Sequence, residues 1–222
     1  NFLGRGQTLS FNLSVGNGSQ EGSLAFVEPY FLGRDVAFSF QGSYGRTSFA
    51  TNSFFDSQQG SLRTGLQFPV SENARLDMSF IGRLSEITNV APGSSQILRQ
   101  EAALGTESAI GVGYEFSFDN RATGLNPDAG VLLRFGQDIA GLTSSMDYLK
   151  TTGLAVAERT LPRSDVTLRA VFEGGAINSL GGSMSKITER FFLSQNQLRG
   201  FDFRGVGPRD LNVANLDALG GN

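Results

Sequence analysis

The 222-residue chain contains no cysteine, no histidine and no tryptophan. Without cysteine it has no disulfide, no zinc–thiolate site and no thiol nucleophile. Without histidine the common catalytic triads and histidine metal sites are excluded. Apolar runs are short, and none approaches the roughly 18–20 residues that a membrane-spanning helix needs. The 18 basic and 21 acidic residues are spread along the chain, so the concentrated basic surface typical of nucleic-acid binding is also missing.

Apolar and polar positions alternate along most of the chain. Leu9 and Phe11 fall on one side of an extended segment, for example, whereas Ser10 and Asn12 fall on the other. A β-strand places successive side chains on opposite faces, so each such segment has one apolar and one polar side. The pattern predicts nine strands, near residues 8–15, 22–31, 35–44, 58–68, 74–87, 106–119, 130–139, 146–160 and 165–177.

The alternation is least regular in the seventh and eighth of these segments. There Lys150 and Glu158 fall on the nominally apolar side. The connections carry a second signal, because proline cannot donate to a strand ladder and favours turns. Along the chain, short connections that contain a proline alternate with connections that lack one or are long. The prolines are Pro29, Pro69, Pro127 and Pro162, and the long connections are 45–57, 88–105 and 178–222.

Short turns at one end and long loops at the other are typical of transmembrane β-barrels. The alternative is a soluble β-sandwich or a lipocalin-like barrel, which also alternates. A packed core does not tolerate many charges, yet the polar side carries eight of them. These are Arg63, Arg75, Asp77, Arg83, Glu115, Arg134, Arg169 and Glu173. With a phenylalanine-rich opposite side, the sequence favours an all-β, antiparallel membrane barrel with a polar lumen.

Motifs for chemistry are weak. Gly111-Val112-Gly113 resembles the start of a dinucleotide loop but lacks the third glycine and lies within a predicted strand, so small lipid-facing or close-packed positions explain it better. Carboxylates are scattered and form no pair suited to acid–base catalysis. We therefore expect no enzyme, no cofactor and no metal site.

Residues 178–222 do not alternate, and a loop of this length is usually functional or disordered. Phe191, Phe192, Phe201 and Phe203 favour an ordered, packed segment. Arg199 precedes Gly200, which permits backbone conformations closed to other residues. From the residues alone, an arginine anchor inside a barrel and an exposed loop with ordinary turn glycines remain equal alternatives.

Several short motifs resemble BamA-type outer-membrane assembly factors in their order along the chain. Leu198-Arg199-Gly200-Phe201 is similar to the (V/L/I)-R-G-F signature of that family's sixth outer loop, and Gly207-Pro208-Arg209 to the segment that follows it. Further matches are the turn Glu28-Pro29-Tyr30-Phe31, the Phe68-Pro69 turn, Asn1-Phe2-Leu3-Gly4, and Ala218-Leu219-Gly220-Gly221-Asn222. Ser194-Gln195 departs from the family, where many relatives carry two glycines.

The resemblance implies a slice of a 16-stranded barrel, in which the nine predicted strands are the third to the eleventh. It implies one partial barrel domain over residues 1–222, with strands within 8–177 and residues 178–222 as the sixth outer loop, folded into the lumen. There Arg199 would bind acidic residues of later strands, and Gly200 and Phe201 would shape the apex of the loop. Arg199→Ala is expected to loosen the loop and to lower barrel stability or assembly activity.

The function implied is the non-enzymatic folding and insertion of other outer-membrane β-barrel proteins, within the BAM complex of the Gram-negative envelope. The implied partners are the outer-membrane bilayer, nascent barrel proteins and periplasmic accessory lipoproteins. Two alternatives stay open: a two-partner secretion transporter, which shares the barrel and an arginine–glycine loop motif, and a passive pore. The Glu28-Pro29-Tyr30-Phe31 turn and Gly207-Pro208-Arg209 favour the assembly factor over the transporter.

Overall fold

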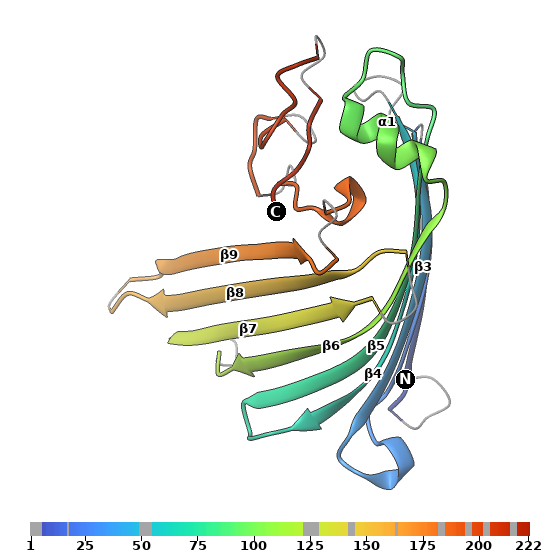
Figure 1. Cartoon of the computed structure of the whole chain (residues 1–222). Helices are drawn as coiled ribbons and strands as arrows, with labels where there is room; N and C mark the ends of the chain where they lie inside the picture. Colours follow the sequence, from blue (N-terminus) through green and yellow to red (C-terminus); the bar gives the residue numbers. More distant parts are fainter. Residues whose placement is uncertain are drawn as a thin grey trace.

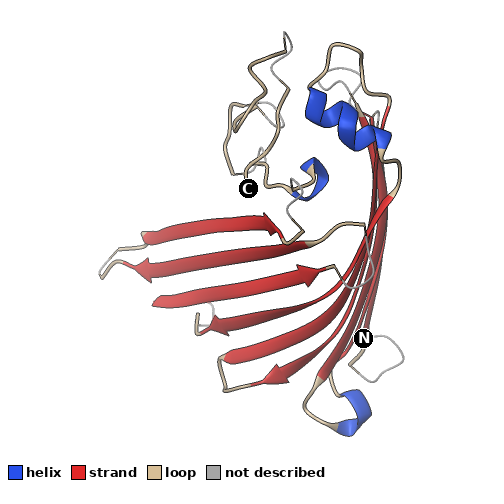
Figure 2. Ribbon diagram, viewed as in Figure 1, coloured by secondary structure: helices blue, strands red, loops and turns tan. Residues whose placement is uncertain are grey.

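The fold is a single antiparallel sheet of nine strands in sequential order (Figures 1 and 2). The computed structural model describes residues 6–16, 18–48, 55–121, 129–141, 145–162, 164–181, 185–193, 197–201, 205–213 and 217–222. The strands are β1 (Thr8–Val15), β2 (Ser19–Glu28), β3 (Ala37–Ser48), β4 (Asp56–Pro69), β5 (Ala74–Thr88), β6 (Glu107–Asp119), β7 (Ala129–Ala140), β8 (Tyr148–Thr160) and β9 (Thr167–Ser179). The all-β class and all nine predicted strands are confirmed.

The sheet is curved and open, with β1 and β9 as its two edges (Figure 1). Each strand pairs only with its neighbours in sequence, as in an up-and-down barrel. The expectation of a partial barrel is confirmed by this open curvature. Among the described residues, no helix has the length and apolar character required to cross a membrane.

The register separates the two faces of the sheet. We call the face on which residues 185–193 lie the inner face and the opposite one the outer face. All eight charged side chains that the sequence assigned to the polar side occupy inner positions, as the pairs Arg75↔Ser117 and Asp77↔Glu115 illustrate. The outer face carries exposed phenylalanines: Phe11 is 73% exposed and Phe172 74%. The phenylalanine-rich side is therefore exposed and does not form a dry core, which agrees with the prediction from the sequence.

The register explains the irregular alternation of apolar and polar residues in β8. Lys150 pairs with Ile177 and Glu158 with Arg169, so both belong to the inner face and not to an apolar outer side. Tyr148 shares that inner face and is 3% exposed. Apolar residues occur on the inner side of β8 because the chain beyond β9 covers part of it, which obscures the alternation in the sequence.

Strand ends differ most from the prediction in β2 and β3, and β2 already begins at Ser19 instead of residue 22. The second strand ends at Glu28 instead of residue 31, because Pro29 lacks an N–H and the chain turns through the short 3₁₀ helix η1 (Phe31–Gly33). The connection expected over 45–57 is shorter, since β3 continues to Ser48 and β4 begins at Asp56. Ser48 Oγ donates to Asp56 Oδ1 at 2.8 Å, which keeps these polar residues in the ladder.

The two ends of the sheet are unlike. The connections 29–36, 70–73 and 161–166 lie at one end, which we call the short-turn end. The other end, the long-loop end, holds the 89–106 connection and the chain after β9 (Figure 1). The predicted division into proline turns and long loops is confirmed there, although Pro127 lies outside the described residues. The sequence missed the helix α1 (Gln96–Ala103), which Ser95 caps by accepting a hydrogen bond from Ile97 N.

Dry packing is found at the long-loop end. One cluster of buried residues gathers Ala109, Ala140, Met146, Tyr148 and Ile177, with Phe191 packed against it. A second gathers Phe55, Ile87, Leu98 and Ile187, with Phe192 and Leu219 among the residues around it. Both clusters combine the wall of the sheet with residues that follow β9. The chain after β9 therefore completes the hydrophobic packing of this end.

Candidate functional site

The candidate site lies where the chain after β9 meets the inner face. We call the described residues from 185 to 222 the C-terminal segment; it lies at the long-loop end beside α1 (Figure 1). Two short backbone pairings fold it on itself, Phe191 with Gly221 and Arg209 with Ala218. Its first turn is the 3₁₀ helix η2 (Ile187–Glu189).

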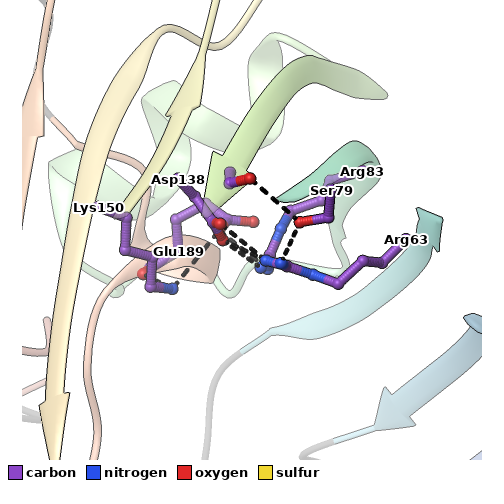
Figure 3. Close-up of polar contacts among 7 residues, drawn as sticks. Arg63, Ser79, Arg83, Asp138, Lys150 and Glu189 are labelled. Carbon is purple, nitrogen blue, oxygen red and sulfur yellow. Dashed lines mark hydrogen bonds and ion pairs between the residues drawn. The ribbon is translucent and has the colours of Figure 1, made fainter. Parts of the chain in front are cut away.

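A chain of charges crosses the inner wall toward this segment. Asp138 accepts hydrogen bonds from Arg63 Nη2 on both of its oxygens, at 2.7 Å each, and lies 3.9 Å from Arg83 Nη2. Arg83 Nη1 lies 3.1 Å from the Glu189 carboxylate, which is also 3.7 Å from Lys150 Nζ. Figure 3 shows these side chains converging from β4, β5, β7, β8 and η2. The wall is thus linked electrostatically to the C-terminal segment.

Gly113 leaves space for the Asp138 carboxylate in this row of charged side chains. A Cβ atom there would lie 2.1 Å from Asp138 Oδ1, which is too close for any side chain. Its carbonyl oxygen also accepts from Ser79 Oγ at 3.5 Å, and Ser79 accepts from Arg63 Nη1 at 2.6 Å. Gly111 and Gly113 both lie on the inner face, where a Cβ at Gly111 would also meet a backbone oxygen at 2.0 Å. Close packing therefore explains Gly111-Val112-Gly113, and the lipid-facing explanation is wrong.

An aromatic contact reinforces the charged one. Lys150 Nζ lies 5.0 Å from the centroid of the Phe191 ring, within range of a cation–π interaction. Lys150 Nζ also donates to the backbone oxygen of Glu189 at 2.8 Å. The ring rests against Gly175 of β9, where a Cβ would lie 2.5 Å from Phe191 Cζ. Lys150, which breaks the alternation in the sequence, is thus a contact residue for the segment.

The other side of the C-terminal segment holds α1. Ser95 N donates to Asp217 Oδ2 and Ser95 Oγ to Asp210 Oδ2, both at 2.6 Å. Two carboxylates at the first turn of a helix also complement its dipole. The hydrogen bond from Ser95 is the main cause of a lowered pKa for Asp210.

A buried carboxylate joins the far end of α1 to η2. Both oxygens of Glu101 accept from Ile187 N at 3.1 Å. Burial raises the pKa of Glu101 from 4.5 to about 7, against the lowering effects of the Ile187 hydrogen bond and of Lys186 and Arg190. Glu101 therefore changes its charge near neutral pH at the contact between the helix and the segment.

The two parts of the loop motif are used differently. Arg199 is exposed and forms no hydrogen bond or ion pair with another described residue. Gly200 has φ +88°, a left-handed conformation that favours glycine, and Phe201 is 53% exposed. Leu198 is half-buried. The anchoring role implied for Arg199 stays a prediction, because its expected acidic partners belong to later strands.

The Gly207-Pro208-Arg209 part, by contrast, is built into the segment. The Pro208 carbonyl accepts from Leu219 N at 2.8 Å, and Arg209 Nη2 donates to the Gly205 carbonyl at 3.0 Å. Gly207 adopts φ +134°. This part therefore lies beside Ala218–Asn222, and the fold brings together two motifs that the sequence treated separately. Ser194-Gln195 and Phe203 lie outside the described residues.

The Glu28-Pro29-Tyr30-Phe31 turn lies at the opposite, short-turn end. Glu28 accepts from Tyr30 N at 3.2 Å and from the side chain of Gln7. Phe31 stacks on Phe38 with ring centroids 5.2 Å apart, and Tyr30 is 63% exposed. The two motif groups thus mark opposite ends of the sheet. Asn1-Phe2-Leu3-Gly4 falls outside the described residues.

A cavity of about 500 Å³ separates part of the segment from the wall. Phe191, Phe192 and Pro208 line one side, and Glu115 and Arg134 line the other. In the described part of the chain no group of three or more acidic residues is placed to hold a metal ion. The contacts of the site are therefore those of a docked segment.

Sequence reasoning missed the residues that carry the docking, which are Glu101, Asp138, Glu189, Asp210 and Asp217. Each is a single carboxylate whose partner lies far away in the sequence. Two signals pointed toward them: the misplaced Lys150 in β8, and the Phe191-Phe192 pair directly after Glu189 and Arg190.

The family is decided by the match of the whole chain to one domain. The model of the Omp85 superfamily domain matches residues 1–222. The chain belongs to the Omp85 superfamily. The BamA-type resemblance read from the motifs is confirmed by this match and by the similar proteins below.

Similar Omp85 proteins carry names from protein assembly. The Sorting and assembly machinery component 50 homolog of Xenopus tropicalis is 27% identical over 96% of this chain and 50% of its own length. The outer membrane protein assembly factor BamA of Neorickettsia risticii is 27% identical over 71% of this chain and 20% of its own length.

The fold is also that of a solved relative. The crystal structure of BamA from Haemophilus ducreyi lacking POTRA domains 1–3 superposes with a TM-score of 0.77 at 19% identity, over 100% of this chain and 46% of that one. The chain thus spans about half the length of the SAM50-type relatives and of this solved structure.

Proposed function

We propose that this chain is part of the barrel of an outer-membrane assembly factor, which folds and inserts other outer-membrane β-barrel proteins without a chemical step. The observation that carries the proposal is a curved sheet with a charged inner face and an exposed apolar outer face, with the segment containing Leu198–Phe201 following its last strand. The names of similar proteins, BamA and Sorting and assembly machinery component 50, support the same role.

The physical basis is the contrast between the faces. Exposed phenylalanines such as Phe11 and Phe172 suit the hydrocarbon of a bilayer, whereas paired charges such as Arg63 and Asp138 suit a wet lumen. Insertion then needs strand edges to which a client strand adds by β-augmentation. No catalytic side chain is required for such a process.

The finer proposal places the protein in the outer membrane of a Gram-negative envelope as the central subunit of a BAM-type complex. Its partners would be the bilayer, nascent barrel proteins and periplasmic accessory lipoproteins. The order of the BamA-type motifs supports the bacterial type, including Glu28-Pro29-Tyr30-Phe31 and Gly207-Pro208-Arg209. In this proposal residues 178–222 form a lumen-facing loop of a single barrel domain.

The test is reconstitution of the full-length protein in lipid vesicles together with an unfolded outer-membrane barrel protein. We expect the client to become heat-modifiable and protease-resistant faster than in empty vesicles. Depletion in the source cells should lower the amounts of several unrelated barrel proteins together. Export of one secreted protein without an effect on other barrels would identify a two-partner transporter instead. Steady ion conductance with no effect on client folding would identify a passive pore.

A further inference from the structure

Glu189 lies at a point of the inner wall where positive charge is in excess. Arg63, Arg83 and Lys150 bring three cations to this part of the wall. The wall contributes two carboxylates: Asp138, in the group of Figure 3, and Asp77, which interacts electrostatically with Arg63. Asp138 is engaged by Arg63 through both oxygens. Arg83 and Lys150 are therefore left with Glu189 as their second source of negative charge.

Glu189 is 4% exposed and comes from the C-terminal segment, not from the sheet. A buried carboxylate is stable only with charged or hydrogen-bonding partners. Among the described residues, the two cations paired with it belong to the wall: Arg83 Nη1 at 3.1 Å and Lys150 Nζ at 3.7 Å. Removal of the segment would leave a cationic wall, and removal of the cations would leave a buried acid. The Glu189 carboxylate and the cations of the wall therefore stabilise each other.

Phe191 provides a second, apolar contact two residues further on. Its ring occupies the space above Gly175 that a side chain would fill, and it packs against the cluster around Tyr148 and Ile177. Lys150 lies between the two contacts, donating to the Glu189 backbone and facing the Phe191 ring. The wall thus provides two adjacent contacts for the segment: the cations Arg83 and Lys150 for Glu189, and the surface without a side chain at Gly175 for the Phe191 ring.

We propose that Glu189 and Phe191 are the positioning residues that dock the C-terminal segment, and with it Leu198–Phe201, on the inner wall. The BamA-type resemblance assigns anchoring to Arg199 alone, yet Arg199 is exposed and contacts no charged partner among the described residues. Docking through Glu189 and Phe191 is a property of the fold. Its importance for client insertion rests on the proposed function.

The first test measures docking through a buried reporter. Ile177 of β9 is 3% exposed in the cluster against which Phe191 packs, and this chain has no cysteine, so Ile177→Cys gives a thiol on the wall that reacts with maleimide when the segment leaves it. In the full-length protein, with any cysteine elsewhere replaced, we expect Glu189→Gln to speed labelling by about tenfold or more. Arg83→Gln should act similarly, and the double variant should label far more slowly than the product of the two effects predicts.

The matched control is Glu115→Gln. Glu115 is also an inner-face carboxylate and lines the cavity beside the segment, but it forms no ion pair with a described residue. Its variant should label as the parent does. Additive effects of Glu189→Gln and Arg83→Gln, or equal effects of Glu189→Gln and Glu115→Gln, would overturn the charged half of the anchor.

The second test uses two adjacent glycines of β9. Gly175→Ala should displace the Phe191 ring and speed labelling, whereas an added Cβ at Gly174 meets only Phe172, at 3.9 Å. The methyl group of Gly175→Ala would also lie 2.9 Å from Thr151 O. Combining Gly175→Ala with Phe191→Ala separates displacement of the ring from this backbone contact. That double variant should label no faster than Phe191→Ala alone; faster labelling would show that the ring is not what the methyl group displaces.

Client insertion is then measured on the same variants. A rise in Ile177→Cys labelling with a matching loss of insertion supports both the anchor and its use. A rise in labelling with unchanged insertion confirms the anchor and overturns its link to assembly. Unchanged labelling in Glu189→Gln overturns the anchor whatever the insertion rate, so failure of this inference is distinguishable from failure of the proposed function.

Discussion

The contact between α1 and the C-terminal segment should depend on pH through Glu101. The folded carboxyl has a pKa of about 7, raised from 4.5 chiefly by burial. A carboxyl whose pKa is raised by docking is held more favourably when protonated. Docking should therefore be strongest at acid pH and weaken as the pH rises from about 4.5 through about 7. The shift is worth about 3 kcal/mol at most, and about 2.5 kcal/mol of it falls between pH 5 and 8.

The charged neighbours of Glu101 do not reverse this sign. Lys186 and Arg190 lower its pKa and Glu107 raises it, but burial dominates. Glu107 is itself paired with Lys186 at 3.0 Å. The lowered pKa of Asp210 keeps that carboxylate charged throughout the range. Glu101 is therefore the group expected to titrate at this contact between pH 5 and 8.

Hydrogen–deuterium exchange of the peptide that contains Ile187 measures this contact. After correction for intrinsic exchange rates, we expect protection in the wild type to fall by about 50-fold or more from pH 5 to pH 8. Glu101→Gln keeps one acceptor for Ile187 N without a charge, so its protection should be nearly independent of pH and should exceed that of the wild type at pH 8. Parallel pH profiles for the two proteins would refute the reasoning.

Three further changes test the packing of the inner wall and of α1, with the temperature at which the folded barrel loses its gel mobility as the measure. Gly113→Ala should displace the Asp138 carboxylate and cost about 2 kcal/mol, whereas Gly82→Ala, with Leu62 at 3.8 Å, should be nearly neutral. Tyr148→Phe should be neutral or stabilising, because the buried hydroxyl finds no hydrogen-bond partner among the described residues. Asp217→Ala should cost about 1–3 kcal/mol by leaving the buried backbone N–H of Ser95, the N-cap of α1, unpaired; an unchanged transition temperature would contradict this assignment.

The sheet could be predicted from the sequence because the patterns that indicate strands and turns are local. A period of two assigns each side chain to a face, and a proline such as Pro29 ends a ladder wherever it occurs. These signals need no knowledge of distant residues, so all nine strands and the unlike ends were predicted. The errors fell where a tertiary contact overrides the period, as at Lys150, or where a side-chain hydrogen bond extends a strand, as at Ser48 and Asp56.

The docking contacts were not accessible for the opposite reason. Glu189 meets Arg83 and Lys150, and Asp217 meets Ser95, across separations that no local pattern encodes. A single glutamate in a loop resembles any solvated charge until its partners are placed. The short helix α1 contains good helix formers, but eight residues are too few for a stable helix in isolation. It was missed because its stability derives from tertiary contacts: Leu98 packs with Ile87 and Ile187, and Glu101 accepts from Ile187 N.

The position of the dry clusters has a consequence for how the molecule opens. Ile187, at 0% exposed, and Phe191 belong to packing that the wall cannot complete by itself. Undocking of the segment would therefore expose apolar surface on the wall and on α1 at the same time as it separates Glu189 from Arg83. Apolar exposure opposes release at every pH, whereas the ionisation of Glu101 increasingly favours release as the pH rises from about 4.5 through about 7. The segment should consequently remain docked most of the time in the wild type at neutral pH. Loss of either the ionic or the aromatic contact should make transient release more frequent, and loss of both should make the detached state prevail.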